Sequence, residues 1–353
     1  MTTFSIPRGI PRFQEEISSK PVTDVSVIIV GWNTRDLLMD CLRSVHFETR
    51  EVKYEVLYID NASKDDSVAM VRREFPRVRI LENRENLGFV AASNQGIALA
   101  KGRYALLLNS DTIILDDAIS KVVDFADEHP RGAAFGCKVL NPNLSVQRSC
   151  FMAPSILNMV LFSSYLYKIF PHSRFFGRQM MTWWDCSDVR EVETVSGCFS
   201  LVRRAAIEEI GMMDPVYFFY GDDLDWCYRF RKRGWKVIFT PSASIIHLGG
   251  KSSMHMRRAF RLQLFGTALV FLRLNRSRAA FIAGALLNAL FFALRCPYWL
   301  ASALKAGRDR HSSLYEAGTC AIGFFLSLFD WKRMLMNREA VEARLKWDRR
   351  SQA

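Results

Sequence analysis

Short, mostly apolar runs alternate with helical patterns through the first part of the chain. Runs rich in Val, Ile and Leu, typical of strands buried on both faces, occupy residues 25–30, 56–59, 78–81 and 104–108. Between them, apolar residues recur at helical spacing in residues 38–45, 66–75 and 89–101. This alternation predicts right-handed βαβ units, and hence an α/β fold with a mostly parallel central sheet.

The residue types at the ends of these patterns predict two helix caps. Asn33 and Thr34 precede the first helical pattern, and their side chains can accept hydrogen bonds from the free N–H groups of a helix N-terminus. Gly102 follows the third pattern, where glycine can adopt the left-handed conformation that ends many helices. We therefore expect an N-terminal cap at residues 33–34 and a C-terminal cap at Gly102.

The alternation continues to about residue 250. Beyond an aromatic and Met-rich stretch, the sequence predicts a strand at 197–202, a helix to about Gly211, a helix at 222–233 and a strand at 235–239. We therefore expect one α/β domain at residues 24–250, preceded by an extension at residues 1–23. Residues 251–353 form a separate region.

This C-terminal region differs from the α/β domain in both charge and hydropathy. Residues 1–250 carry 30 basic and 30 acidic side chains, whereas residues 251–353 carry 18 and 6, so the net charge of +12 lies entirely there. The same region holds the longest apolar run, 279–294, and a second at 317–329. Basic and apolar residues together favour an anionic membrane surface as the partner. No zinc finger, RNA-recognition signature or helix–turn–helix pattern supports nucleic-acid binding.

Several forms of membrane contact are compatible with this region. As a helix, residues 279–294 would reach about 24 Å, short of a hydrocarbon core of about 30 Å, and we expect Arg295 and Pro297 to interrupt it. An in-plane or re-entrant anchor is therefore favoured over a full span that continues to residue 304. Residues 256–278 would form an amphipathic helix on the leaflet. The alternative is a buried helical subdomain that covers one side of the α/β domain.

Composition and missing motifs exclude several classes of protein. Half of the residues are apolar and 24% are charged, which excludes a disordered chain. The eight cysteines are scattered without a CxxC pair and residues 1–22 have no apolar signal segment, so we expect reduced, mostly buried thiols in a cytosolic setting. The absence of GxGxxG after the first strand and of GxxxxGK[ST] disfavours a dinucleotide oxidoreductase and a P-loop NTPase.

Carboxylates and one histidine stand where the predicted strands end or helices begin. They are Asp60, Asp111, Asp222, Asp223, Asp225 and His247. Ligands of parallel sheets bind beyond these strand ends. One carboxylate there can bind a divalent cation that holds a diphosphate, and another can act as general base on a hydroxyl. Each residue also has a structural interpretation: turn residues for Asp60 and Asp111, a helix N-cap for Asp222, and a structural histidine for His247.

Five motifs in order are more informative than any single residue. They are VSVIIVGWN (25–33), IDNASKDDS (59–67), NLGFVAASNQG (86–96), LLLNSDT (106–112) and FYGDDLD (219–225), with His247 after them. In these motifs the chain resembles the family 2 inverting glycosyltransferases, and most of all their bacterial rhamnosyltransferase-like branch, over roughly residues 24–250. The resemblance implies a GT-A fold, a nucleotide-sugar donor and a divalent cation, Mg²⁺ or Mn²⁺.

The resemblance also implies which residues contact the donor. Asp60 would hydrogen-bond the nucleobase. The remaining nucleotide-sugar contacts would come from Asn86, Gly88, Asn94, Asn109, Ser110 and Asp222.

The resemblance further implies a metal site and a base. Asn109 stands at the first position of the family's DxD element, where Asp is usual, so Asp111 would be the main acidic metal ligand, together with His247. Asp223 matches the second carboxylate of the family's acidic pair. It would take the proton from an acceptor hydroxyl in a single displacement that inverts the anomeric carbon.

The resemblance and the basic, apolar tail together indicate the acceptor. A membrane-associated transferase suits a glycan or a polyprenyl-diphosphate-linked acceptor at the cytoplasmic face of the bacterial inner membrane. The preferred donor is dTDP-rhamnose, from which L-rhamnose would be transferred. The alternatives are transfer of another hexose or N-acetylhexosamine, and an inactive membrane-bound protein that binds nucleotide sugars.

Overall fold

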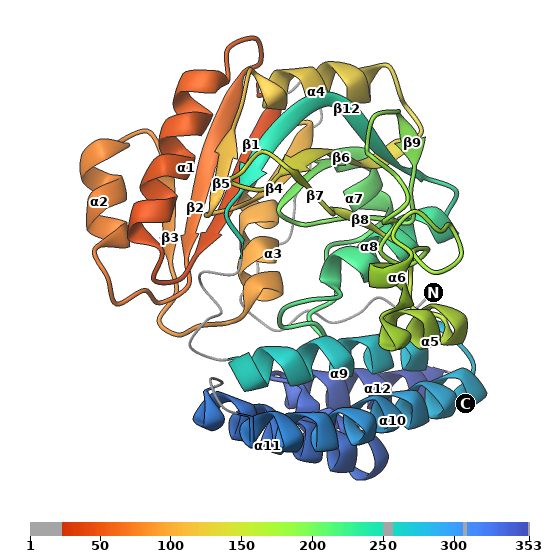
Figure 1. The fold of residues 1–353 in the computed structure, drawn as a ribbon. Helices are drawn as coiled ribbons and strands as arrows, with labels where there is room; N and C mark the ends of the chain where they lie inside the picture. The colour runs from red at the N-terminus through yellow and green to blue at the C-terminus, as the bar shows by residue number, and fades with distance from the viewer. Residues whose placement is uncertain (1–22, 250–256, 306–308, 352–353) are drawn as a thin grey trace.

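The computed structural model of the chain describes residues 23–249, 257–305 and 309–351. The extension predicted at residues 1–23 and the expected boundary at residue 250 therefore lie almost wholly outside the described residues. In Figure 1 a twisted sheet with its helices occupies the upper part of the molecule, and the helices after residue 257 lie together beneath it. The chain thus has an α/β part and a helical C-terminal part that lie against each other.

The strands follow the predicted runs and extend several of them. The main sheet contains β1 (Val25–Gly31), β2 (Tyr54–Asp60), β3 (Arg79–Glu82), β4 (Tyr104–Asn109), β5 (Thr112–Ile114), β6 (Gly132–Leu140), β7 (Val146–Gln147), β9 (Arg190–Glu191), β11 (Phe199–Arg203) and β12 (Lys236–His247). A separate small sheet pairs β8 (Cys150–Phe151) with β10 (Thr194–Val195).

Helices connect these strands and then form the C-terminal part. The α/β part contains α1 (Arg35–Glu48), α2 (Ser67–Glu74), α3 (Phe89–Leu99), α4 (Ala118–Asp127), α5 (Ile156–Ser164), α6 (Leu166–Ile169), α7 (Arg204–Ile210) and α8 (Asp222–Lys232). The C-terminal part contains α9 (Arg257–Asn275), α10 (Arg278–Ala303), α11 (Arg310–Phe329), the 3₁₀ helix η2 (Trp331–Met334) and α12 (Arg338–Ser351).

The predicted α/β class is confirmed, and the sheet is mixed. Its order is β3-β2-β1-β4-β11-β6-β12-β5. β3, β2, β1 and β4 are parallel neighbours, as the βαβ pattern predicts. β11 then enters antiparallel between β4 and β6, and β5 runs antiparallel to β12. The first four strands, where strand and helix alternate most regularly in the sequence, therefore pair only in parallel with one another, and β6 and β12 form a further parallel pair.

The sheet is buried on both faces, as its apolar strands predict. On one face, Val25, Val27 and Ile29 of β1 join a cluster with residues of α1, α2 and α4. On the other face, Ile28 joins residues of α3, α7 and α8. All eight cysteines are free, and all but Cys296 are buried, which confirms the expectation for the thiols.

The predicted N-cap position is confirmed without its hydrogen bond, and the predicted C-cap is wrong. Thr34 occupies the N-cap position of α1, but its side chain makes no capping hydrogen bond. α3 ends at Leu99, and Ala100 takes the C-cap position in place of Gly102. Gly102 serves close packing instead, because a Cβ there would lie 2.5 Å from the backbone nitrogen of Ser26.

α9 is a buried helix, which contradicts the prediction that residues 256–278 lie on a membrane surface. In the part of that segment that the structure describes, side chains 269–272 are 1% exposed or less. Val270 belongs to the same hydrophobic cluster as residues of the sheet, as do Leu335 and Val341. One core therefore extends through both parts of the chain.

α10 is continuous over Arg278–Ala303, so the interruption expected at Arg295 and Pro297 does not occur. The Arg295 guanidinium donates to the carbonyls of Ser163 (2.8 Å) and Phe291 (3.2 Å), and it lies 3.6 Å from the centre of the Phe291 ring. Because carbonyl oxygens and an aromatic face stabilise the charge, the helix accommodates Arg295 without ending.

The two sides of α10 have different surroundings. The inner side packs on α9: a Cβ at Gly284 would lie 2.4 Å from the Leu272 side chain, and the Asn288 amide donates to the Phe265 carbonyl at 3.2 Å. The outer side carries a large apolar residue at every fourth position, each more than half exposed. This outer apolar stripe consists of Ile282, Leu286, Leu290, Leu294 and Tyr298.

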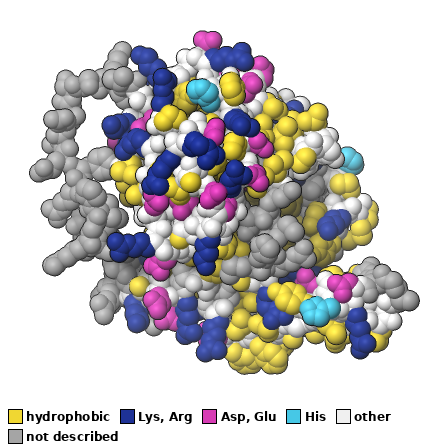
Figure 2. All heavy atoms as spheres, turned by 90° about the vertical axis from the view of Figure 1, so that its left-hand side faces the viewer, with side chains coloured by type: hydrophobic (Ala, Val, Ile, Leu, Met, Phe, Trp, Pro, Cys, Tyr) yellow, Lys and Arg dark blue, Asp and Glu magenta, His cyan; other side chains and the backbone are white. Residues whose placement is uncertain are grey.

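α10 and α11 are long and apolar enough to cross a membrane, judged by length and composition alone. In their most apolar segments, 28% and 39% of the residues are buried inside the molecule, so much of each segment is exposed. Figure 2 shows hydrophobic side chains gathered at the lower edge of these helices, with Lys and Arg side chains above them. Within the described residues, the C-terminal part therefore presents an apolar surface that the other elements leave exposed.

Candidate active site

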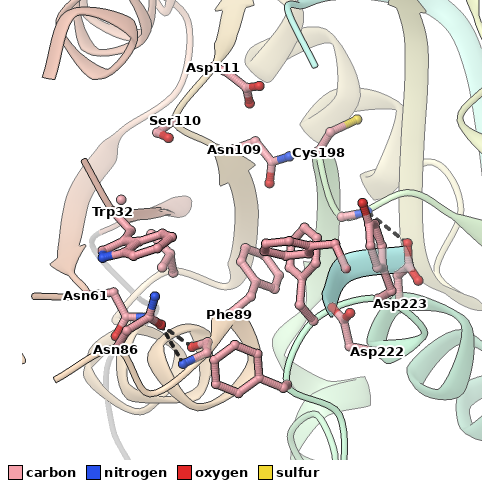
Figure 3. A pocket seen from close by; sticks show the side chains of 18 of the residues that line it. Trp32, Asn61, Asn86, Phe89, Asn109, Ser110, Asp111, Cys198, Asp222 and Asp223 are labelled. Carbon is pink, nitrogen blue, oxygen red and sulfur yellow. Dashed lines mark hydrogen bonds between the residues drawn. The ribbon is translucent and has the colours of Figure 1, made fainter. Parts of the chain in front are cut away.

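A cavity of about 290 Å³ opens at the carboxyl ends of β1 and β4 (Figure 3). β2 and β3 lie on one side of β1 and β4 on the other, so the connections after β1 and β4 diverge at this point. Ligands of open α/β sheets bind at such reversals of strand order. Of the predicted site residues, those lining the cavity are Asn86, Gly88, Asn109, Ser110, Asp111, Asp222, Asp223 and His247.

Asp111 and His247 lie side by side on one wall of the cavity. The β5–β12 ladder pairs His247 with Thr112, and the Leu248 N–H donates to the Asp111 carbonyl at 2.9 Å. An Asp111 carboxylate oxygen consequently lies 3.3 Å from Nε2 of His247, and the Asn109 amide nitrogen lies 3.2 Å from the same Nε2. Sheet pairing therefore assembles this group from two distant segments of the chain.

Gln147 of β7 fixes which ring nitrogen of His247 carries the proton. The Gln147 amide nitrogen donates to the Asn141 side chain (2.9 Å) and to the His247 carbonyl (3.1 Å), so the Gln147 oxygen faces the imidazole. That oxygen lies 2.7 Å from Nδ1 of His247 and requires a proton on Nδ1. Nε2 is then the basic nitrogen, beside the Asp111 carboxylate. The sequence analysis missed Gln147, because only the β6–β7 pairing brings it here.

The opposite end of the cavity is a network of amide side chains (Figure 3). The Asn61 amide nitrogen donates to the Asn86 side-chain oxygen (2.8 Å) and the Gly88 carbonyl (3.2 Å). The Asn61 oxygen accepts from the Leu87 N–H at 3.1 Å. Gly88 has a φ of +84°, and a Cβ there would lie 2.6 Å from the Phe218 ring, so only glycine fits. The loop before α3 is therefore fixed against the end of β2.

Asp60 and Asn94 lie behind the cavity wall and are not among its described lining residues. The Asp60 carboxylate accepts from the Tyr58 hydroxyl (2.8 Å) and the Ser63 N–H (3.0 Å), which is the turn role. The Asn94 side chain donates to the Met213 carbonyl (2.8 Å) and accepts from the Met213 N–H (3.2 Å). In this structure both residues support the loops that border the cavity.

Asp222 and Asp223 are the first two residues of α8. Gly221, with a φ of +80°, holds the N-cap position, so Asp222 is not the helix cap. The Asp223 carboxylate accepts from the N–H groups of Leu224 (2.8 Å) and Gly197 (3.3 Å). Asp222 is 6% exposed, and Asp223 is partly exposed. Free N–H groups at a helix start favour a negative charge, which suits a carboxylate here.

The two carboxyls differ in how readily they ionise. Burial, joined by the nearby charge of Asp223, raises the pKa of Asp222 to about 8. Burial also raises the pKa of Asp223, but the N–H groups of Leu224 and Gly197 oppose that rise. The first charge on the pair therefore resides on Asp223, and Asp222 keeps its proton to higher pH.

Asp225 has a structural role. Its carboxylate is paired with Arg229 at 2.8 Å and accepts from the Asn275 amide of α9 at 3.4 Å. It therefore links α8 to the C-terminal part and does not face the cavity.

Several lining residues were not among the predicted site residues. Trp32 and Asn61 follow β1 and β2 directly, and they stand inside motifs that the sequence analysis singled out. Phe260 of α9 and Met336 beyond η2 come from the C-terminal part, and no local sequence signal relates them to the cavity. The remaining lining residues are Val30, Gly31, Phe89, Ser196, Gly197, Cys198, Phe218, Phe219 and Tyr220.

Comparison with known proteins identifies the family. Residues 21–264 match the family model described as "Glycosyltransferase like family 2". An N-acetylglucosaminyl-diphospho-decaprenol L-rhamnosyltransferase of Mycobacterium tuberculosis (strain ATCC 25618 / H37Rv) is 29% identical over 238 residues, 64% of this chain and 76% of that protein. The family match covers the α/β part with all five motifs.

Two solved structures share the fold. A mannosyltransferase from Pyrobaculum calidifontis, in complex with GDP-Man and Mn²⁺, superposes with a TM-score of 0.51 at 18% identity and covers 96% of this chain and 91% of that one. GalNAc-T7 with UDP, GalNAc and Mn²⁺ gives a TM-score of 0.52 at 14% identity, covering 88% and 57%. The chain belongs to glycosyltransferase-like family 2, and it is a glycosyltransferase with the GT-A fold.

Proposed function

We propose that this glycosyltransferase moves L-rhamnose from dTDP-rhamnose to a hydroxyl of a polyprenyl-diphosphate-linked glycan, with inversion at the anomeric carbon. The observation that carries the proposal is one cavity that holds the carboxyl of Asp223 and a separate acid–imidazole pair, Asp111 and His247. The similarity to a rhamnosyltransferase of Mycobacterium tuberculosis supports the choice of sugar and acceptor.

The cavity calls for a divalent cation when a nucleoside diphosphate binds. Among the described lining residues there is no Lys or Arg, whereas Asp111, Asp222 and Asp223 are acidic. The two ligand atoms of Asp111 and His247 are 3.3 Å apart, close to the ~3 Å between neighbouring ligands of an octahedral cation with bonds of ~2.1 Å. Since no group of three or more His, Cys, Asp or Glu side chains suited to a metal occurs in the described residues, diphosphate oxygens and water would complete the coordination. Bound Mg²⁺ or Mn²⁺ would neutralise charge on the leaving diphosphate.

The nucleoside of the donor and the base Asp223 would lie at opposite ends of the cavity. Trp32, Asn61 and Asn86 offer an indole face and amides to the nucleobase and ribose, with Asp60 behind them. Asp223 takes the proton of the acceptor hydroxyl as that oxygen attacks. The raised pKa of Asp222 favours its protonated form, which avoids a second negative charge near the diphosphate.

The proposed location is the cytoplasmic face of the bacterial inner membrane, with α10 lying in the membrane surface. The inner side of α10 is fixed to α9 and, through Arg295, to the Ser163 carbonyl of α5. A membrane-spanning orientation would break these contacts, whereas an in-plane orientation keeps them and buries the outer apolar stripe in the lipid.

A donor screen tests the proposal. The full-length protein would be incubated with several nucleotide sugars, a polyprenyl-diphosphate-linked N-acetylglucosamine acceptor and Mg²⁺ or Mn²⁺, and release of nucleoside diphosphate would be measured. We expect the fastest acceptor-dependent release from dTDP-rhamnose and a product of inverted configuration by NMR. Faster release from a UDP- or GDP-hexose would assign another sugar. Nucleotide-sugar binding without any turnover would support the inactive binding protein.

A further inference from the structure

The aromatic end of the cavity is formed jointly by the α/β part and the C-terminal part. The rings of Phe89 and Phe219 lie edge to face with centroids 6.2 Å apart, and Phe219 meets Phe260 of α9 in the same way at 5.3 Å. Phe260 also meets Tyr220, at 6.3 Å. All four rings line the cavity that contains Asp223. They form one continuous apolar wall, which we call the aromatic wall.

A buried glutamine of α9 holds this wall in place. Gln263 is completely buried, and its amide nitrogen donates to the Phe219 carbonyl at 3.1 Å. Its side-chain oxygen accepts from the Met336 N–H at 2.8 Å. One side chain thus ties the loop before Asp222 to α9 and to the segment after η2. Neither hydrogen-bonding group of the Gln263 amide is left unpaired, so the link is specific to an amide.

The loop that carries the wall has an unfavourable backbone. Tyr220 has a φ of +65°, which is rare for a residue other than glycine. The next residue, Gly221, lies against α9, because a Cβ there would come within 3.1 Å of Thr267. Conformations of this kind persist where surrounding contacts impose them, and they cluster at functional sites. Here the imposed conformation places the wall immediately before Asp222 and Asp223.

From this geometry we infer that the aromatic wall binds the sugar ring of the acceptor, and that the C-terminal part therefore supplies part of the acceptor site. The inference rests on the proposed function. The base must reach the reacting hydroxyl within hydrogen-bond distance, so the group beside Asp223 is the sugar that carries this hydroxyl. One face of a pyranose ring is lined by C–H groups, which pack favourably on the electron-rich faces of aromatic rings. The prenyl chain lies farther away, outside this wall.

Phe260→Ala tests this inference in the full-length protein. Phe260 is only partly buried, so truncation should leave the fold intact. We expect the KM for the acceptor to rise about tenfold while the Kd for the nucleotide sugar with Mn²⁺ is unchanged. Leu264→Ala, one turn along α9 and outside the cavity lining, is the matched control and should leave both constants as in the wild type. Phe260→Leu, which keeps apolar volume without a ring, should fall between the two.

A second measurement separates acceptor binding from turnover and from folding. Saturation-transfer NMR would follow a soluble glycan acceptor without a prenyl chain, bound to Asp223→Asn with and without Phe260→Ala. Loss of saturation transfer to the C–H protons of the sugar ring when Phe260→Ala is introduced supports the inference. An unchanged acceptor KM for Phe260→Ala, or an effect confined to acceptors that carry a prenyl chain, would overturn it. If the wild type transfers sugar to no hydroxyl at all, the proposed function fails instead.

Discussion

The two ends of the cavity are built in different ways, although they form one site. The donor end lies on the parallel strands, where the Asn61 amide donates to the Asn86 side chain and the Asn61 oxygen accepts from the Leu87 N–H. The base end combines a strained Tyr220, two carboxyls whose pKa is raised by burial, and residues from α9 and beyond η2. The amide network of the donor end thus joins segments within residues 61–88, whereas the base end depends on contacts between the α/β part and the C-terminal part.

Because the two ends are built differently, a substitution in one of them should affect either donor binding or acceptor use, but not both. Alterations in the C-terminal part should affect acceptor use and leave donor binding nearly intact. Alterations around Asp111 should affect the donor and its cation first. Each prediction below either challenges this division or makes it more quantitative.

Asp223→Asn should have the largest effect. Removing a general base commonly costs about 10²–10⁴-fold, so transfer should fall by that factor while donor affinity with Mn²⁺ stays near the wild-type value. Transfer rates and isothermal calorimetry of the nucleotide sugar measure the two quantities. If Asp223→Asn retained more than about a tenth of the wild-type turnover, Asp222 would be assigned as the base instead.

Asp111→Ala should weaken nucleotide binding only when a divalent cation is present, because it removes a charged oxygen ligand. His247→Ala should do the same to a smaller extent. Gln147→Leu should lower Mn²⁺ affinity about 10–100-fold, since the imidazole loses the partner that fixes its protonation. Mn²⁺ electron paramagnetic resonance with dTDP tests all three variants. If every variant bound dTDP with wild-type affinity, both with and without the cation, these residues would not belong to the site.

Leu290→Glu on the outer apolar stripe should lower partitioning to anionic vesicles roughly tenfold, because a buried Leu contributes about 1.5–3 kcal/mol. Turnover on a soluble acceptor should not change. Phe47→Glu, which replaces an exposed apolar residue of α1, is the control and should bind vesicles like the wild type. High salt screens charges over about 8 Å or less and should leave most wild-type binding intact. Release of the wild type by salt alone would contradict apolar insertion.

Asp222→Asn should change how stability depends on pH. A carboxyl whose pKa is raised from about 4 unfolded to about 8 folded stabilises the fold below pH 4. That contribution is lost as the pH rises toward 8. The Tm of Asp222→Asn relative to the wild type should therefore increase between pH 5 and pH 8, measured without nucleotide or metal. A Tm difference that is constant with pH would show that Asp222 ionises normally.

Sequence patterns predicted the parallel half of the sheet and the group of polar residues at its edge, because continuous apolar runs and strand-end carboxylates are local features. They failed where distant contacts decide. Arg295 does not end α10, because its guanidinium donates to the Ser163 carbonyl and lies over the Phe291 ring, and both contacts stabilise its charge. Phe260 and Met336 reach the cavity only through the packing of the C-terminal helices, which no short motif encodes.

The position of α9 also sets a distance. One side of α9 reaches the cavity loop through Gln263, and another side meets α10 through the Phe265 carbonyl and Leu272. A helix with its side chains is about 10–12 Å across. In the orientation that we propose, with α10 in the membrane surface, Asp223 would lie about one helix diameter above the lipid. The fold would then limit the length of the acceptor. A sugar close to the lipid headgroup would meet Asp223, whereas the terminal sugar of a longer glycan would extend past Asp223.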